Sequence, residues 1–181
     1  MENRLFGRAD TLRFDVHPKD PESFSVQRVD IHALNLHITE NDNSVYVPNF
    51  LFRLDRALLS FDKNTRFEQR PDVFGELDPE EIHRIFMDGS DDHPEVLDVS
   101  DRYEFLQFGD VTLHVASFLI PAQGRVYLTC EIGGHPDDVT TREVRVSEVR
   151  VEELSQVMAD TLALVAGEYD GDKSSLSWRR G

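Results

Sequence analysis

The sequence predicts an α+β fold, in which a mostly antiparallel sheet of about five or six strands carries two main helices and one short helix. Several stretches alternate apolar and polar residues with the period of two that a half-buried strand shows, and others repeat apolar residues at helical spacing. Turn residues separate neighbouring stretches at short intervals, so that strands can pair as hairpins. We expect a single domain over residues 1–170 and a flexible C-terminal tail over residues 171–181.

The most apolar stretch of the chain, residues 111–132, predicts a central hairpin. Residues 111–120 are largely apolar at both parities, which is typical of a strand covered on both faces. A turn over 121–124 follows, and residues 125–132 then alternate apolar and polar side chains. We therefore expect the second strand to be exposed to solvent on one face. No residue in this hairpin indicates catalysis.

The N-terminal part of the chain predicts more strands and then a helix. Residues 12–16 alternate and end near Pro18, which favours an edge strand. Residues 24–38 are extended, but their apolar parity changes twice, which predicts a bulge, a bend or two shorter strands. A short strand over 45–47 returns, and apolar residues at helical spacing predict a helix over 48–61.

The second half of the chain opens with a helix over 78–88, which begins with an N-cap aspartate and a proline at the first helical position. An acidic loop over 89–98 and a strand over 103–108 follow. The residues near 144–151 predict a further strand with a parity slip. An apolar stripe over 152–166, with two glutamates in the first turn, predicts the second main helix.

The charge of the chain excludes one class of function. Its formal net charge is −16, so we expect no binding to nucleic acid, because the surface repels phosphate. Residues 72–101 hold eleven acidic residues and one basic residue, Arg84, a net charge of −10. No run is apolar enough to span a membrane and the N-terminus has no signal-peptide core, so we expect a cytoplasmic protein without membrane contact. The single Cys130 predicts a buried hydrophobe and no internal disulfide.

The acidic segment is the first candidate site, and three interpretations stay open: a solvated face, a Ca²⁺ or Mg²⁺ site, or a recognition surface for a basic partner. An EF-hand is not indicated, since the glycine and the final glutamate of its loop are missing. Concentrated charge would speed the encounter with a positive cleft. Phe74 and Phe86 are candidate apolar anchors. The candidate partner-binding residues are Glu76, Glu80, Asp88, Asp91, Asp92, Glu95, Asp98, Asp101 and Tyr103.

The histidines give no metal site. His32 and His37, five apart in extended chain, are expected on opposite faces, and no other pair has ligand spacing. We predict no catalytic residue, no metal and no cofactor. His114 is expected to be a hydrogen-bonded core or interface residue, although an enzyme or ligand-binding site on the sheet would use His114 with Glu131. No Gly-x-Ser-x-Gly elbow or phosphate-binding glycine loop is present.

Residues 35–50 form a strand, an Asp-Asn turn and a Tyr-x-Pro entry into a helix. This arrangement resembles small bacterial immunity proteins of polymorphic-toxin systems of the contact-dependent inhibition type. The resemblance implies a non-enzymatic antidote that binds one cognate toxin, often a nuclease, and blocks its active site. It brings no catalytic or binding residues. We therefore expect an acidic inhibitor of a basic toxin domain. The alternatives are a small enzyme or ligand-binding protein, and an assembly subunit that uses a sheet edge.

Overall fold

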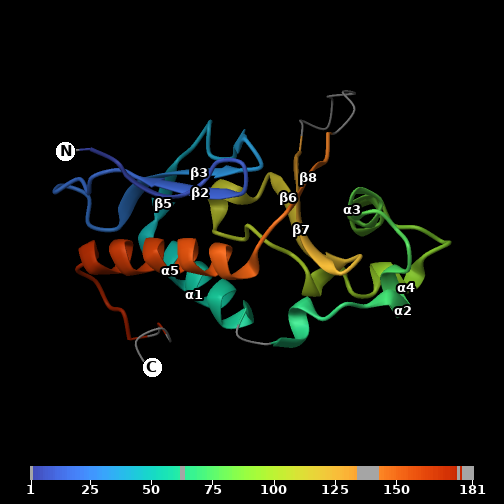
Figure 1. Ribbon diagram of the computed structural model, residues 1–181. Coiled ribbons are helices and arrows are strands. Elements are labelled where there is room, and N and C mark those ends of the chain that lie inside the picture. Colours follow the sequence, from blue (N-terminus) through green and yellow to red (C-terminus); the bar gives the residue numbers. More distant parts are fainter. Residues whose placement is uncertain (1, 62–63, 134–142, 175, 177–181) are drawn as a thin grey trace. The chain divides into compact units, whose positions relative to one another are not determined.

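The computed structural model describes residues 2–61, 64–133, 143–174 and 176 (Figure 1). The α+β class and the antiparallel pairing are confirmed, and the strands lie in two sheets, of five and three strands. The chain divides into two compact units. Unit 1 comprises the described residues of Met1–Asp62, Gln107–Leu113 and Val151–Gly181, and unit 2 those of Lys63–Leu106 and His114–Arg150.

The five-stranded sheet belongs to unit 1. Its strands are β1 (Arg4–Gly7), β2 (Leu12–Val16), β3 (Val26–Ala33), β4 (Leu36–His37) and β5 (Ser44–Tyr46). The order is β1-β2-β3-β4, and β5 pairs with the N-terminal end of β3. The predicted edge position of β2 is wrong, because β1, a strand that the sequence did not predict, pairs along its other side.

The predicted interruption of the extended stretch over 24–38 is confirmed. The stretch contains two strands, β3 and β4, which are joined by a tight turn at Leu34 and Asn35. Both turn residues have positive φ, 52° and 63°, so the chain reverses there within two residues. The reversal brings β4 back beside the end of β3.

Two helices of unit 1, α1 (Val47–Phe61) and α5 (Val151–Glu168), pack against each other and on one side of this sheet (Figure 1). Leu12, Phe14 and Val16 of β2 are fully buried beneath them. The Phe14 ring contacts those of Phe50 and Phe108, at centroid distances of 6.1 and 5.5 Å. The intervening residues Arg13, Asp15, Asp30 and His32 are polar and only partly buried, so they lie on the sheet face away from this core.

The three-stranded sheet of unit 2 contains the predicted central hairpin, formed by β6 (Val115–Ala122) and β7 (Arg125–Ile132) and extended by β8 (Arg145–Glu148). The hairpin turns at Gln123 and Gly124, both with positive φ. The predicted start of the first strand at residue 111 is wrong. Asp110–Thr112 form the 3₁₀ helix η3, and the next residue, Leu113, is 75% exposed.

Helix α3 (Pro79–Asp88) packs against this sheet, and the remaining helical elements of unit 2 are short. They are η1 (Asn64–Phe67), α2 (Pro71–Phe74), α4 (Pro94–Leu97) and η2 (Ser100–Arg102). The acidic loop predicted over 89–98 therefore contains a helix. The core of unit 2 consists of Val73, Phe74, Ile82, Ile85, Phe86, Val96, Tyr103, Phe118, Ile120 and Ala122.

The strand predicted over 103–108 is reduced to one bridge, between Glu104 and Phe118. Two backbone hydrogen bonds flank the bridge: the N–H of Phe105 donates to the carbonyl of Ser117, and that of Leu119 donates to the carbonyl of Tyr103. The segment therefore shields the free edge of β6 without forming a full strand. Cys130 is buried, as predicted.

Parts of two predicted features, the loop after residue 132 and the tail over 171–181, lie outside the described residues. The described helices include none with the length and apolar character needed to cross a membrane.

Candidate functional site

Eight of the nine predicted partner-binding residues lie on the surface of unit 2. Glu80 and Asp88 project from α3, Glu95 from α4, and Asp101 from η2, and all eight carboxylates are exposed. We call this set the acidic surface. Its residues are Glu76, Glu80, Asp88, Asp91, Asp92, Glu95, Asp98 and Asp101.

The acidic surface is carried by folded elements that the apolar pattern positions. Ile82, Ile85 and Phe86 of α3 and Val96 of α4 enter the core of unit 2, which turns the carboxylates of the same helices to solvent. The predicted side-chain cap of α3 is not formed. Asp78 has extended backbone angles, as an N-cap should, but its Oδ1 accepts from the amide of Gln123 at 3.3 Å.

Few cations balance these carboxylates. Arg84 donates to Glu80 at 2.8 Å along α3, and His93 lies 3.6 Å from Glu95. Among the described residues, Glu76, Asp91, Asp92, Asp98 and Asp101 form no ion pair. The negative field of the segment therefore extends into solvent with little compensation.

Tyr103, the ninth predicted partner-binding residue, is not on the surface. Its side chain is fully buried, with its ring 5.4 Å from that of Phe74 and stacked 6.2 Å from that of Phe86. Phe74 and Phe86, the other candidate anchors, are 1% and 8% exposed. All three aromatic residues belong to the core of unit 2. The hydrogen bond from Leu119 to the Tyr103 carbonyl fixes the Tyr103 segment against β6.

The two residues of the enzyme alternative differ in burial. His114 is exposed, which contradicts a core position, while Glu131 on β7 is 4% exposed and pairs in register with Ala116. The buried neighbour of Glu131 is His83, whose Nε2 lies 3.6 Å from Glu131 Oε2.

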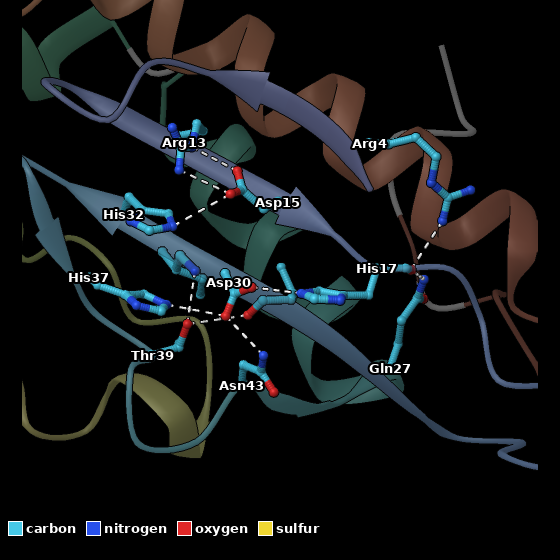
Figure 2. Close-up of polar contacts among 12 residues, drawn as sticks. Arg4, Arg13, Asp15, His17, Gln27, Asp30, His32, His37, Thr39 and Asn43 are labelled. Carbon is cyan, nitrogen blue, oxygen red and sulfur yellow. Dashed lines mark hydrogen bonds and ion pairs between the residues drawn. The ribbon is translucent and has the colours of Figure 1, made fainter. Parts of the chain in front are cut away.

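A second polar site, absent from the sequence-based predictions, occupies the outer face of the unit 1 sheet (Figure 2). We call it the Arg-Asp-His cluster. Register places Asp15 of β2 directly opposite Asp30 of β3, with Arg13 opposite His32. The members are Arg13, Asp15, His17, Asp30, His32, His37 and Asn43.

Asp30 is the acceptor at the centre of this cluster (Figure 2). Its Oδ2 lies 2.6 Å from His17 Nε2, and its Oδ1 accepts from His37 Nε2 at 3.1 Å and from Asn43 Nδ2 at 2.8 Å. Burial would raise the pKa of the Asp30 carboxyl, but the hydrogen bonds from His17, Asn43 and His37 hold that pKa below its ordinary value. The carboxylate therefore stays charged and orients both imidazoles.

Asp15 contacts a separate pair of side chains, one arginine and one histidine. Its carboxylate is bound by Arg13, with 2.7 Å between Arg13 Nε and Asp15 Oδ1, and His32 Nε2 lies 3.6 Å from Asp15 Oδ2. The rings of His32 and His37 stack at 4.4 Å. Burial lowers the pKa of His32, and the neighbouring Arg13 and His37 lower it further.

The predicted placement of His32 and His37 on opposite faces is wrong, because the turn at Leu34 and Asn35 makes them register partners. Within the described residues, no group of side chains could hold a metal ion. The cluster instead fixes its histidine rings on the sheet face, with His17 and His37 against Asp30 and His32 near Asp15. The sequence did carry a signal, an Arg-x-Asp-x-His pattern at residues 13–17 and again at 28–32.

No known protein family, curated protein or solved structure matches this chain. Residues 35–50, on which the expected resemblance to immunity proteins depends, span β4, β5 and the start of α1. A proposal about function therefore depends on the chemistry of the chain's own surfaces.

Proposed function

We propose that this chain is a non-enzymatic, immunity-type inhibitor that binds a basic toxin domain, a nuclease in particular, through the acidic surface. The observation that carries the proposal is the exposure of all eight carboxylates, four of them on α3, α4 and η2 and the others in the turns that flank these elements, with few cations nearby. The proposal includes no cofactor and no nucleic-acid partner. It includes a cytoplasmic location, where such an inhibitor would meet an incoming nuclease.

Charge arranged in this way accelerates association. Complementary fields raise association rate constants from about 10⁵–10⁶ to as much as about 10⁸–10⁹ M⁻¹s⁻¹ at low salt. A nuclease needs positive charge to hold its phosphate substrate, so an acidic protein matches the surface that the enzyme must expose. The carboxylates that form no ion pair within unit 2 keep their charge available for such a partner.

The experiment uses a candidate toxin domain encoded immediately upstream of the gene for this chain. Association is followed by stopped flow between about 50 and 500 mM NaCl, where screening shortens the range of the field. We expect the association rate constant to fall by about tenfold or more over this range. The variant Asp91→Asn, Asp92→Asn, Glu95→Gln, Asp98→Asn should reduce both the rate constant and its salt dependence.

A matched control removes the same charge from unit 1. The exposed residues Glu2, Glu22, Glu40 and Glu152 are each changed to Gln. This control should retain most of the rate and salt dependence, because the lost charges lie off the acidic surface. The proposal would be refuted by an association rate constant that does not change with salt concentration, or by an equal reduction of the rate constant in both variants. A toxin whose activity persists in a saturated complex would refute inhibition.

A further inference from the structure

A pocket of about 380 Å³ opens on unit 2 between two segments that are distant in sequence. Residues 69–76, which include α2, line one side, and residues 121–124, the end of β6 with its turn, line the other. Phe74, Pro121 and Ala122 are buried and supply apolar lining together with Pro71.

Among the described residues, three of the four polar side chains that line the pocket have hydrogen-bond partners: Gln69, Arg70 and Gln123. The Gln69 side chain donates to the carbonyl of Arg125 and accepts from the N–H of Gly124, both at 2.9 Å. The Gln123 amide donates to the carbonyl of Leu77 at 3.4 Å. Glu76, a member of the acidic surface, has no hydrogen-bond or ion-pair partner among the described residues.

The single cation of the pocket lining, Arg70, is already neutralised. Its Nε and Nη2 donate to the two carboxylate oxygens of Asp72, at 2.9 and 2.7 Å. This side-on pairing fixes the guanidinium and removes most of its repulsion toward another cation. An occupant of the pocket therefore encounters apolar walls and one carboxylate without a counter-ion.

We propose that this pocket receives an arginine or lysine side chain of the basic partner, with its alkyl stem on Pro71, Pro121 and Ala122 and its charged end on Glu76. Long basic side chains have this division, since their methylene stems pack on apolar surface while the charge stays at the polar rim. An acidic side chain would be repelled, and a purely apolar one would leave Glu76 without a partner. The inference rests on the proposed function, because it names the feature of the basic partner that the acidic surface would hold.

The test uses a single side chain as the probe, so that it does not depend on an identified partner. N-acetyl-arginine amide is titrated at constant ionic strength into the ¹⁵N-labelled full chain, with the lysine and leucine analogues in parallel. We expect saturable shifts at the amides of Gly75, Glu76 and Gly124 for the two basic probes, and much smaller shifts for the leucine probe.

Two variants separate the pocket from the general field. Glu76→Gln should weaken the binding of the basic probes at these amides about fivefold or more, because the charge-assisted contact is lost. Asp101→Asn removes the same charge from the acidic surface outside the pocket lining and should change this binding less than twofold. Equal effects of the two variants, or shifts spread over the carboxylates without the pocket amides, would overturn the inference. Salt-dependent binding of a basic toxin domain could survive that result, so the two proposals fail separately.

Discussion

His83 should make unit 2 sensitive to mild acid. Its side chain is 0% exposed on α3, and its ring meets that of Phe118 edge-on at 5.1 Å. The Thr129 hydroxyl lies 2.8 Å from Nδ1 and can donate to the carbonyl of Phe118, so it accepts from Nδ1–H. The other ring nitrogen, Nε2, is buried and has no hydrogen-bond partner among the described residues. A second proton on this imidazole would therefore have no direct acceptor.

The size of the effect follows from the shifted pKa. The pKa of His83 is lowered from 6.5 to about 4, mainly by burial and also by the neighbouring Arg84, while Asp88 and Glu80 oppose the shift. The unfolded chain therefore binds more protons than the folded chain between pH 6.5 and pH 4, and the free energy of unfolding falls as the pH falls through this window. Each pH unit is worth about 1.4 kcal/mol, so the full loss is about 3 kcal/mol.

The assay is urea unfolding followed by far-UV circular dichroism at pH 7.5, 6.5, 5.5 and 4.5. His83→Asn keeps a donor for Thr129 but cannot titrate, so the variant should be less stable than the wild type at pH 7.5 and should lose less stability on acidification. His32→Asn is the control in unit 1, where burial also lowers the pKa of the histidine. Its removal should leave the His83 contribution intact.

The refuting result is a wild-type stability that stays constant or rises between pH 6.5 and pH 4.5. Glu131 is the physical reason that such a result could occur. Its Oε2 lies 3.6 Å from His83 Nε2, and a charged carboxylate there would favour the protonated ring. Glu131→Gln removes that charge, and restoration of the acid sensitivity in this variant would identify Glu131 as the cause.

Three further predictions concern single side chains, each measured by urea unfolding. Asp30→Asn should reduce the free energy of unfolding by about 1–3 kcal/mol at pH 7, because three hydrogen bonds to a charged acceptor are weakened. Since the pKa of Asp30 is lowered in the fold, the difference in stability between wild type and variant should shrink as the pH falls below 3.8. A difference that does not change with pH would contradict this prediction. Tyr103→Phe should be neutral or stabilising by about 1 kcal/mol, since the buried hydroxyl has no hydrogen-bond partner within the described part of the chain, and a loss above 1 kcal/mol would reveal one. Gly7→Ala should lower the free energy of unfolding by at least about 2 kcal/mol, because φ of Gly7 is +85° and the new Cβ would lie 2.1 Å from the carbonyl oxygen of Leu12. A smaller loss would show that the turn between β1 and β2 can move.

The elements that the sequence predicted best are those with a long local period. Helix α5 buries Leu154, Met158, Leu162 and Val165, which form one stripe at helical spacing, and the hairpin of β6 and β7 has a long apolar strand ended by a short turn. Such patterns need no information about the rest of the chain. Helix α3 was also predicted from a local signal, the aspartate and proline at its start.

The errors arise where distant contacts decide the structure. β1 has only four residues, with an exposed Leu5, and it is a strand because β2 is beside it. Tyr103 has the polar tip of a surface residue, yet its segment is bound to β6 and its ring completes the core of unit 2. The position of the acidic surface was predictable because carboxylates without partners must face water. The Arg-Asp-His cluster was not, since parity assigns a side chain to a face but does not identify its neighbour across the strands.

Pairwise charge rules would predict a different register for β2 and β3. A shift of two residues keeps every apolar side chain in the core and could place Asp15 opposite Arg28 and Arg13 opposite Asp30, whereas the observed register sets Asp15 against Asp30. The turn that follows β3 explains the choice, because the N–H groups of Leu34 and Asn35 donate to the carbonyls of Thr11 and Ala9 and fix the two strands end to end. Two opposed carboxylates are the consequence, and the fold compensates Asp30 with groups from outside this strand pair, His37 on β4 and Asn43 beyond it. The same repulsion reduces the expected cost of Asp30→Asn, so a measured loss near the lower end of the predicted range would support the view that backbone geometry, and not charge pairing, set this register.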